Sequence, residues 1–197
     1  AGHHAGIITG PDGPTHHATE DIASLRCLPD IQIYVPCDAV EAKKATIASA
    51  NTELPVYFRY SRNKTPIITT EKTPFTVGKM QDFWITDKPQ VTIFAMGYML
   101  YYALVAAKEL EEEGLQTLVI NAATIKPLDT EGVMRFTKQT KSVVTVEDHQ
   151  IMGGLGGAIA EFLAKTNPLP MEFIGLQDTF AESAEPAELL EKYHMDV

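Results

Sequence analysis

The sequence has no long apolar run, very few cysteines and no surplus of basic residues. No stretch approaches the roughly 18 consecutive apolar residues that a membrane span needs, so we expect no membrane partner. The first ten residues, AGHHAGIITG, have neither a basic n-region nor a long apolar core, which argues against a secretory signal. Sixteen Lys and Arg residues against 26 Asp and Glu residues give a formal net charge of -10, which disfavours nucleic acid as a partner.

Metal and redox motifs are also missing. Cys27 and Cys37 lack the spacing of a metal or redox site, so we expect reduced thiols that serve as packing residues in a cytoplasmic protein. Four of the six histidines lie within the first seventeen residues. They form adjacent pairs that do not aim at one centre, and no acidic ligand pattern accompanies them, so we predict no metal site.

What is present is the composition of a globular protein. Hydrophobic residues make up 45% and charged residues 21% of 197 residues, which suffices for one ordinary domain or two small ones. The sequence begins without Met and enters a polar, functional-looking loop almost at once. We therefore expect a fragment, a processed piece or one subunit of something larger.

The residue pattern predicts an α/β protein with two regions. The first region spans residues 1–65, a polar linker with Thr-Pro steps and a candidate strand at 75–79 spans 66–88, and the second region spans 89–197. The elements predicted in the first region are a helix over 15–28, a strand over 31–35, a helix over 39–50 and a strand over 55–60. Asp38 is a natural N-cap for the second of these helices.

The second region alternates strands and helices at short intervals. The predicted strands are 91–95, 116–120, 142–146 and 171–174, and the predicted helices are 99–113, 131–138, 155–165 and 186–193. This alternation predicts a three-layer α/β/α domain with a mostly parallel sheet. The first region is too small to bury a good core alone, so we expect it to pack on the second region, on another chain or on a missing N-terminal part.

The loop GPDGPTHH, residues 10–17, gathers the groups that could carry chemistry. Asp12 could accept hydrogen bonds from substrate hydroxyls, and His16 and His17 could donate or shuttle protons near neutral pH. The loop runs into a predicted helix start, where free N–H groups favour hydroxyls and phosphates. An ordinary turn with Thr15 as N-cap and surface histidines explains the same pattern.

Polar residues also follow two predicted strands. Arg62, in the segment Arg59-Tyr60-Ser61-Arg62, could hold a phosphate with its planar guanidinium, although a solvated arginine pair is an equal alternative. The segment Glu147-Asp148-His149 ends another strand, and the glycine-rich turn 153–157 opens the next helix. This turn could cradle an anion, but it matches neither the dinucleotide nor the P-loop motif, so close helix packing is the better interpretation.

Seven segments run through the chain in a characteristic order: GPDGPTHH, LRCLPDIQIYVPCDAVE, YSR, TIKPLD, TVEDH, GGLG and PAELL. As a set they resemble the C-terminal portion of a transketolase. The resemblance implies that residues 1–65 end a pyrimidine-binding domain and that residues 89–197 form a transketolase C-terminal domain. It also implies a cytoplasmic, thiamine-diphosphate-dependent enzyme of the pentose phosphate pathway that moves a two-carbon ketol unit from a ketose phosphate to an aldose phosphate.

The resemblance assigns roles to four positions. His4 resembles the histidine that helps to bind the sugar phosphate, and Asp12 resembles the aspartate that contacts a substrate hydroxyl. His16 resembles the catalytic-loop histidine that helps with orientation and proton transfer at the reacting carbons. Arg62 resembles the phosphate-binding arginine. His17 stands where many relatives carry Gln, and we assign it no role.

The family's cofactor residues do not match this chain. Its diphosphate and Mg²⁺ motif, GDG followed by an Asn pair about 25–30 residues on, is missing, and the activating glutamate and the aromatic pyrimidine pocket belong upstream of His4. We therefore expect thiamine diphosphate and Mg²⁺ in the complete enzyme, but neither on this chain alone, which is then inactive. The implied partners are sugar phosphates and either a second copy in a homodimer or a missing N-terminal subunit or segment.

Two alternatives stay open. 1-Deoxyxylulose-5-phosphate synthase shares the DGPTH loop, although TIKPLD and TVEDH favour transketolase; a 2-oxo-acid dehydrogenase β subunit fits less well, because its loop does not read DGPTH. The alternative from another class is a non-catalytic structural or dimerisation module. An acidic α/β domain without a cofactor motif fits that as well.

Overall fold

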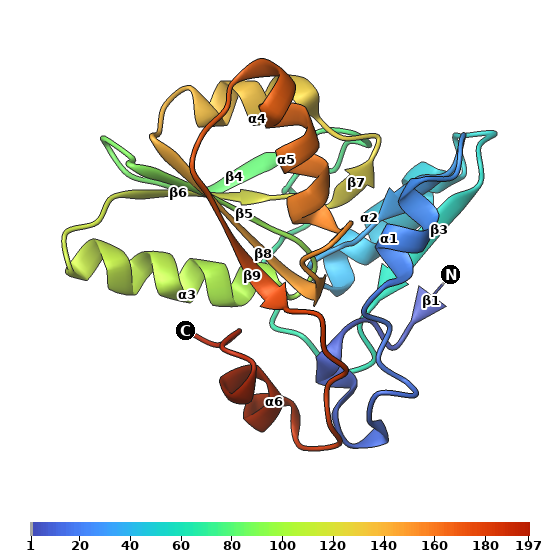
Figure 1. Cartoon of the computed structure of the whole chain (residues 1–197). Coiled ribbons are helices and arrows are strands. Elements are labelled where there is room, and N and C mark those ends of the chain that lie inside the picture. The colour runs from blue at the N-terminus through green and yellow to red at the C-terminus, as the bar shows by residue number, and fades with distance from the viewer. Residues whose placement is uncertain (1) are drawn as a thin grey trace.

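The computed structural model describes residues 2–197, which form two β-sheets with helices packed around them (Figure 1). The strands are β1 (Gly2–His3), β2 (Gln32–Tyr34), β3 (Val56–Tyr60), β4 (Gln81–Ile85), β5 (Val91–Ala95), β6 (Thr117–Asn121), β7 (Thr124–Lys126), β8 (Ser142–Gln150) and β9 (Met171–Leu176). The helices are the 3₁₀ segment η1 (Ile7–Asp12), α1 (Asp21–Arg26), α2 (Ala39–Ser49), α3 (Met99–Glu112), α4 (Thr130–Thr137), α5 (Leu155–Thr166) and α6 (Pro186–Lys192).

The larger sheet has the strand order β4-β6-β5-β8-β9. Strands β5, β6, β8 and β9 run parallel, whereas β4 lies antiparallel to β6 at the edge. Helix α3 covers one face of this sheet, and α4 and α5 cover the other (Figure 1). All five residues of β6 are buried, as expected for a strand covered on both faces. The predicted three-layer arrangement with a mostly parallel sheet is confirmed.

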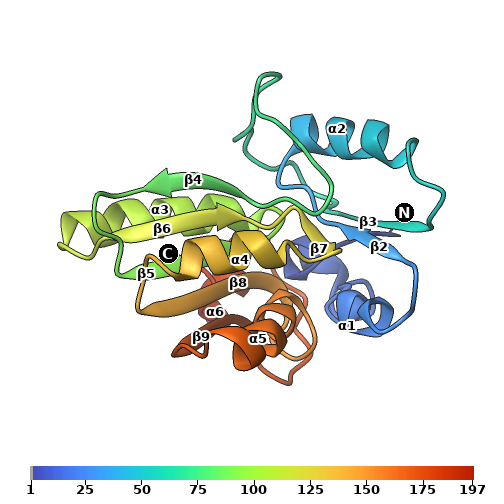
Figure 2. The same cartoon turned by 90° about the horizontal axis from the view of Figure 1, so that it is seen from above.

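The smaller sheet has the order β1-β3-β2-β7. β1, β2 and β3 run parallel, and β7, which comes from the second region, pairs antiparallel with β2. Helices α1 and α2 lie on opposite sides of β2 and β3 (Figure 2). The Asp38 side chain accepts a hydrogen bond from the Glu41 amide at 2.8 Å, which confirms it as the N-cap of α2.

The two regions share their hydrophobic cores. Ile7 and Ile8 of η1 belong to the same buried cluster as Leu189 and Leu190 of α6. A second cluster combines three residues of the first region with the large sheet: its members include Ile22, Ile33, Val35, Phe94, Leu118 and Ile120. Of the three packing partners expected for the first region, the second region is therefore one that the structure provides.

The largest departure from the predicted elements is the helix at 15–28. Helix α1 covers only Asp21–Arg26, because the residues before it form a turn at 14–16 and a β-bridge at Ala18. Ala5 and Ala18 form a parallel bridge. In it the Ala18 amide donates to His4 O at 3.0 Å, and the Gly6 amide donates to Ala18 O at 2.9 Å. Long-range pairing therefore overrides local helix preference here.

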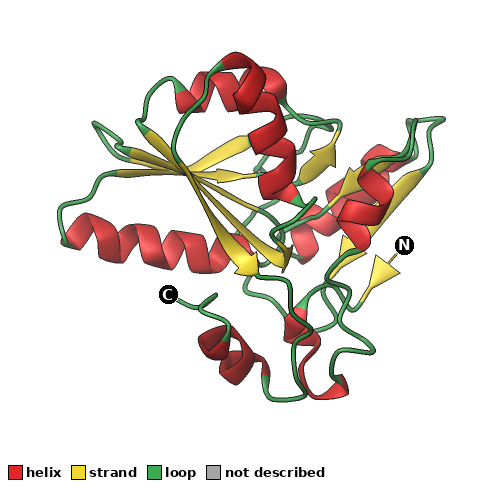
Figure 3. Cartoon of the chain, viewed as in Figure 1, coloured by secondary structure: helices red, strands yellow, loops and turns green. Residues whose placement is uncertain are grey.

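Two short antiparallel strands escaped prediction. The chain from Ser61 to Met80 is irregular and forms no strand at 75–79 (Figure 3). Inside the predicted linker, β4 instead joins the large sheet, and β7 forms where a loop was expected. No helix within residues 2–197 has the length and apolar character to cross a bilayer.

Candidate substrate-binding site

The loop from His4 to Glu20 connects β1 to α1 and carries three of the four predicted site residues. Its backbone adopts positive φ at Gly6 (69°), Gly10 (75°) and Gly13 (75°), a conformation that glycine adopts without steric cost. Gly10 also interrupts η1, which turns the chain sharply before Asp12. The glycine spacing of the sequence therefore determines how the loop folds back on itself.

The imidazole rings of His4 and His16 lie against each other. Their centroids are 5.8 Å apart with an interplanar angle of 62°. Thr15 Oγ1 lies 3.0 Å from His16 Nδ1, which orients that ring on the exposed side of the loop. Two donor-capable rings from opposite ends of the loop thus converge on one place.

Asp12 and Arg62 form an ion pair, with Arg62 Nη1 donating to Asp12 Oδ2. Both side chains are partly exposed, at 33% for Asp12 and 46% for Arg62. The next residue, Asn63, donates a side-chain hydrogen bond to Ile8 O. The segment after β3 is therefore held to η1 at two successive residues.

The four predicted residues are brought together by the pairing of β1 with β3. His3 is in register with Tyr60, and the Ala5 amide donates to Tyr60 O at 3.1 Å. His4 therefore lies beside the end of β3, two residues before Arg62. One end of the small sheet presents two imidazoles, one carboxylate and one guanidinium, a set suited to a phosphorylated polyol.

His17, which received no role, is a structural residue. Its side chain is buried, and Nε2 donates to Gly10 O at 3.1 Å. Burial lowers the pKa of His17. The neighbouring imidazoles of the HH pair therefore differ: His16 faces the site, and His17 holds the loop turn.

Arg59 is not one of a solvated arginine pair, and this corrects that interpretation. Its side chain is 1% exposed and forms ion pairs with Asp21, at 3.0 Å, and Asp148, at 2.7 Å. Nη2 also donates to Ala18 O at 2.7 Å and to Asp148 O at 3.0 Å. The sequence offered one signal for this role, because Arg59 lies inside the predicted strand 55–60 and not in the loop after it. Its partners Asp21 and Asp148 lie far away in the sequence, so the pairing itself could not be predicted.

The glycine-rich turn at 153–157 packs closely, as the sequence favoured. A β-carbon on Gly156 would lie 2.5 Å from Phe173 Cδ1. The buried Glu147 carboxylate accepts hydrogen bonds from the Leu155 and Gly156 amides, each at 2.8 Å. The anion at the start of α5 is therefore the protein's own side chain.

Glu147 and His149 both titrate far from their ordinary range. Burial raises the pKa of Glu147 to about 7, against the two amide hydrogen bonds that lower it. Burial, with Arg59 nearby, lowers the pKa of His149 to about 4. His149 Nε2 accepts from the Ala23 amide at 3.4 Å, and Nδ1 lies 2.6 Å from Gln150 O, which is the pattern of a neutral ring.

A cavity of about 400 Å³ lies beside this network, between α2 and the start of α3. Asp38, Arg59, Tyr98 and Asp148 contribute to its walls, as do Ser61 and Asn63, the neighbours of Arg62. Cys37 also lines it, and burial raises the pKa of that thiol, so it is an unreactive packing residue. Cys27, by contrast, is exposed, which corrects the expectation that both cysteines pack inside.

Among residues 2–197, no group of three or more His, Cys, Asp or Glu side chains is arranged to hold a metal ion. The acidic residues of the site are already engaged, Asp12 with Arg62 and Asp21 with Arg59. The described residues therefore do not fit a divalent cation together with a diphosphate.

Two family models match this chain: the transketolase pyrimidine binding domain over residues 1–67 and the transketolase C-terminal domain over residues 84–197. The chain therefore belongs to the transketolase family. A relative from Methanocaldococcus jannaschii, described as a transketolase C-terminal section, is 40% identical over 98% of this chain and 60% of its own length. An apulose-4-phosphate transketolase subunit of Phocaeicola vulgatus is 34% identical over 97% of this chain and 61% of its own length.

The fold matches solved relatives equally well. A structure titled split gene transketolase, inactive beta4 tetramer, has a TM-score of 0.89 and 38% identity over 98% of this chain and 61% of that chain.

A 1-deoxy-D-xylulose-5-phosphate synthase from Synechococcus is 36% identical over 94% of this chain but only 29% of its own length. The chain thus spans about three-fifths of the first relatives and less than a third of the synthase.

Proposed function

We propose that this chain is the substrate-binding portion of a transketolase that transfers a two-carbon ketol unit between sugar phosphates. The observation that carries the proposal is the convergence of His4, Asp12, His16 and Arg62 at one end of the small sheet. These are the residues at which the sequence resembles the substrate site of the family. The relatives described as transketolase subunits or sections support the same assignment.

Each side chain has a role that its chemistry allows. The partly exposed Arg62 guanidinium would bind the terminal phosphate through charge-assisted hydrogen bonds. His4 and His16 would donate to oxygens of the sugar, and His16 would assist proton transfer near the reacting carbons. Together these contacts turn binding energy into alignment of the sugar.

The Asp12–Arg62 ion pair would allow the site a second arrangement when a phosphate binds. In the free chain the Asp12 carboxylate accepts a hydrogen bond from the Arg62 guanidinium. A dianionic phosphate competes for the same donors, because it offers more charge than one carboxylate. Its arrival would release Asp12 to accept a hydrogen bond from a substrate hydroxyl, so that phosphate and hydroxyl recognition are coupled.

Thiamine diphosphate would supply the carbanion chemistry of the complete enzyme. Since the described residues offer no ligand set for a divalent metal ion, we propose that Mg²⁺ and the diphosphate are held by another segment or subunit. The titles that describe relatives as subunits and as products of a split gene support such an assembly.

The test measures ketol transfer from a ketose phosphate to an aldose phosphate, with this chain in the complete protein or mixed with its N-terminal partner. Arg62→Gln should raise KM for the phosphorylated donor about 10- to 100-fold, because a charge-assisted pair is lost. It should change KM for an unphosphorylated donor little. Arg135→Gln, at an exposed arginine of α4, is the matched control and should leave both values unchanged.

Formation of 1-deoxy-D-xylulose 5-phosphate in place of ketol transfer would assign the chain to the synthase found among its relatives. Complete absence of both activities after mixing would leave the structural or dimerisation module as the function. Unchanged turnover of the unphosphorylated donor by Arg62→Gln separates a loss of phosphate binding from a folding defect.

A further inference from the structure

The loop from His4 to Glu20, which we call the substrate-binding loop, packs against the second region along its length. A β-carbon at Gly6 would lie 1.8 Å from Asp148 Oδ2, and one at Gly10 would lie 3.2 Å from Pro186 Cδ. A β-carbon at Gly13 would lie 2.1 Å from Ser183 Oγ. The three positive-φ glycines of the loop are thus the points at which its backbone approaches residues of the second region.

Apolar packing fastens the middle of the loop. Helix α6 packs on η1, and Ile7, which is fully buried, shares a cluster with Leu189 and Leu190. η1 is the segment that leads directly into Asp12. The last helix of the chain, more than 170 residues away in the sequence, therefore sets the position of a predicted substrate-binding residue.

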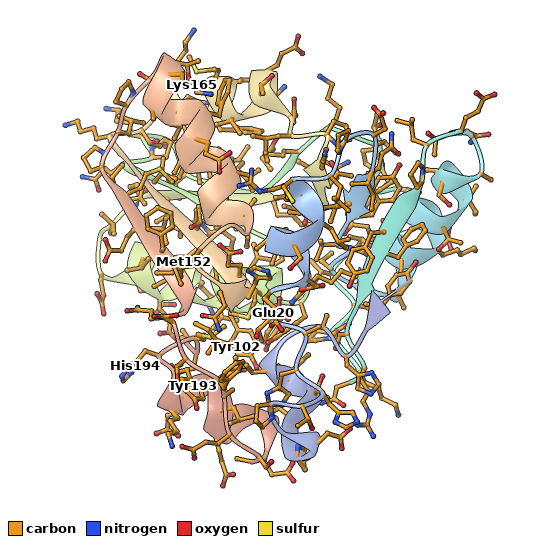
Figure 4. The ribbon with its side chains drawn as sticks, turned by 45° about the vertical axis from the view of Figure 1, so that its right-hand side comes forward. Glu20, Tyr102, Met152, Lys165, Tyr193 and His194 are labelled. Atoms are coloured by element: carbon orange, nitrogen blue, oxygen red, sulfur yellow. The ribbon has the colours of Figure 1, made fainter. Side chains whose placement is uncertain are left out.

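Hydrogen bonds fasten the end of the loop. The Gln150 amide, at the end of β8, donates to Thr19 O at 2.7 Å. Arg59 Nη2 donates to the neighbouring carbonyl, Ala18 O, at 2.7 Å. Figure 4 labels Glu20, which follows Thr19, and Met152, which is two residues after Gln150. The residues that follow His16 are therefore tied to the large sheet.

Arg59 connects the end of the loop to α1 and to β8. Nε donates to Asp21 Oδ2 at 3.0 Å, Nη1 donates to Asp148 Oδ1 at 2.7 Å, and Nη2 bridges Ala18 O and Asp148 O. Asp148 is the residue that Gly6 contacts, and Arg62 follows Arg59 by three residues along the same chain segment. One fully buried guanidinium thus joins the loop, the strand that leads to Arg62 and the second region.

We infer that the second region serves as the template of the substrate-binding loop, and that Arg59 is the positioning residue that couples the two. The inference rests on the proposed function in one respect, namely that the loop binds substrate. Arg59 acts through His16 and Arg62, whose relative placement it determines. Lysine cannot replace it, because an ammonium group has no planar fork that reaches two carboxylates and two carbonyls at once.

The first test is hydrogen–deuterium exchange of the complete protein, which needs no activity. Arg59→Lys should speed exchange at the Gly6 and Ala18 amides about tenfold or more, while β5 stays protected. Asp148→Asn, a nearly isosteric change, is the second variant should Arg59→Lys not fold. Arg26→Lys is the matched control, because Arg26 also bonds across the regions, to Gly153 O and Glu161, but away from the loop.

The second test is kinetic. Both network variants should raise KM for the ketose phosphate about tenfold with a smaller change in kcat, whereas Arg26→Lys should change neither. Equal acceleration of exchange in the loop and in β5, or no acceleration in the loop, overturns the inference. If the parent protein shows no ketol transfer, the proposed function fails by itself, and the exchange experiment still decides whether Arg59 and Asp148 position the loop.

Discussion

At the scale of single residues, Glu147 and His149 show how burial shifts the pKa values of an acid and a base in opposite directions. Both are fully buried at the end of β8, with Glu147 Oε2 3.8 Å from His149 Nδ1. Burial penalises the charged form of each, so the pKa of Glu147 rises from 4.5 to about 7, and the pKa of His149 falls from 6.5 to about 4. Burial therefore shifts each group toward its neutral form relative to the unfolded chain.

These shifts predict opposite pH effects on stability. Between about pH 4.5 and 7 the folded chain retains a proton on Glu147 that the unfolded chain has lost, so this residue makes the free energy of unfolding fall as pH rises. Between about pH 4 and 6.5 the unfolded chain protonates His149 and the folded chain does not, so this residue makes the free energy of unfolding rise with pH.

Glu147→Gln should therefore make stability increase more steeply with pH than in the parent, and His149→Gln should make it increase less steeply or fall. Urea titrations at half-unit intervals from pH 4 to 8 measure both slopes. Changes of the same sign in the two variants would contradict the shifts.

At the scale of elements, the loop from His4 to Glu20 depends on glycine in a way that one matched pair can test. Gly6 and Gly114 both adopt positive φ, at 69° and 92°. A β-carbon on Gly114 would meet no atom of residues 2–197 within 4 Å, whereas one on Gly6 would meet Asp148, which Arg59 holds in place. The two positions thus share backbone strain but differ in close packing.

Gly114→Ala should lower the free energy of unfolding by about 1 kcal/mol, the backbone cost alone. Gly6→Ala should lower it by about 2–4 kcal/mol, because overpacking against a fixed buried carboxylate adds to that cost. Urea denaturation of both variants gives the difference. Equal losses would mean that Asp148 moves aside freely and does not hold the loop.

At the scale of the whole molecule, the two regions behave as one body because the buried residues of the first region belong to clusters that the second region dominates. Ile22 and Ile33 of the first region share a cluster with Phe94 and Leu118 of the second. Strand β7 of the second region completes the small sheet beside β2. Separating the regions would expose apolar side chains of both clusters. It would also break the buried ion pair between Arg59 and Asp148.

We therefore expect one cooperative unfolding transition for the whole chain. Fluorescence of Trp84, the only tryptophan, reports on β4, and exchange of the Phe58 and Tyr60 amides reports on β3. The two probes should give the same urea midpoint. A separate, earlier loss of protection in β3 would show that the first region unfolds independently.

The sequence by itself determined the elements whose signals are local. The alternating strands and helices of the second region, the Asp38 cap of α2 and the close packing at Gly156 all follow from periodicity, capping and glycine spacing. The order of its short segments also pointed to the family that the comparisons identify. Local patterns suffice here because periodicity shows which face of an element is buried, and capping and glycine residues show where an element begins or packs closely.

Only the tertiary structure decided what depends on residues that are distant in sequence. Ala18 is extended because it pairs with Ala5, β7 is a strand because β2 offers it an edge, and Arg59 is buried because Asp148, 89 residues later, neutralises it. The same holds for the loop from His4 to Glu20, which packs against α6 and accepts a hydrogen bond from the end of β8. Such contacts produce no periodic pattern in the sequence, because they depend on which distant segments pack together in the fold.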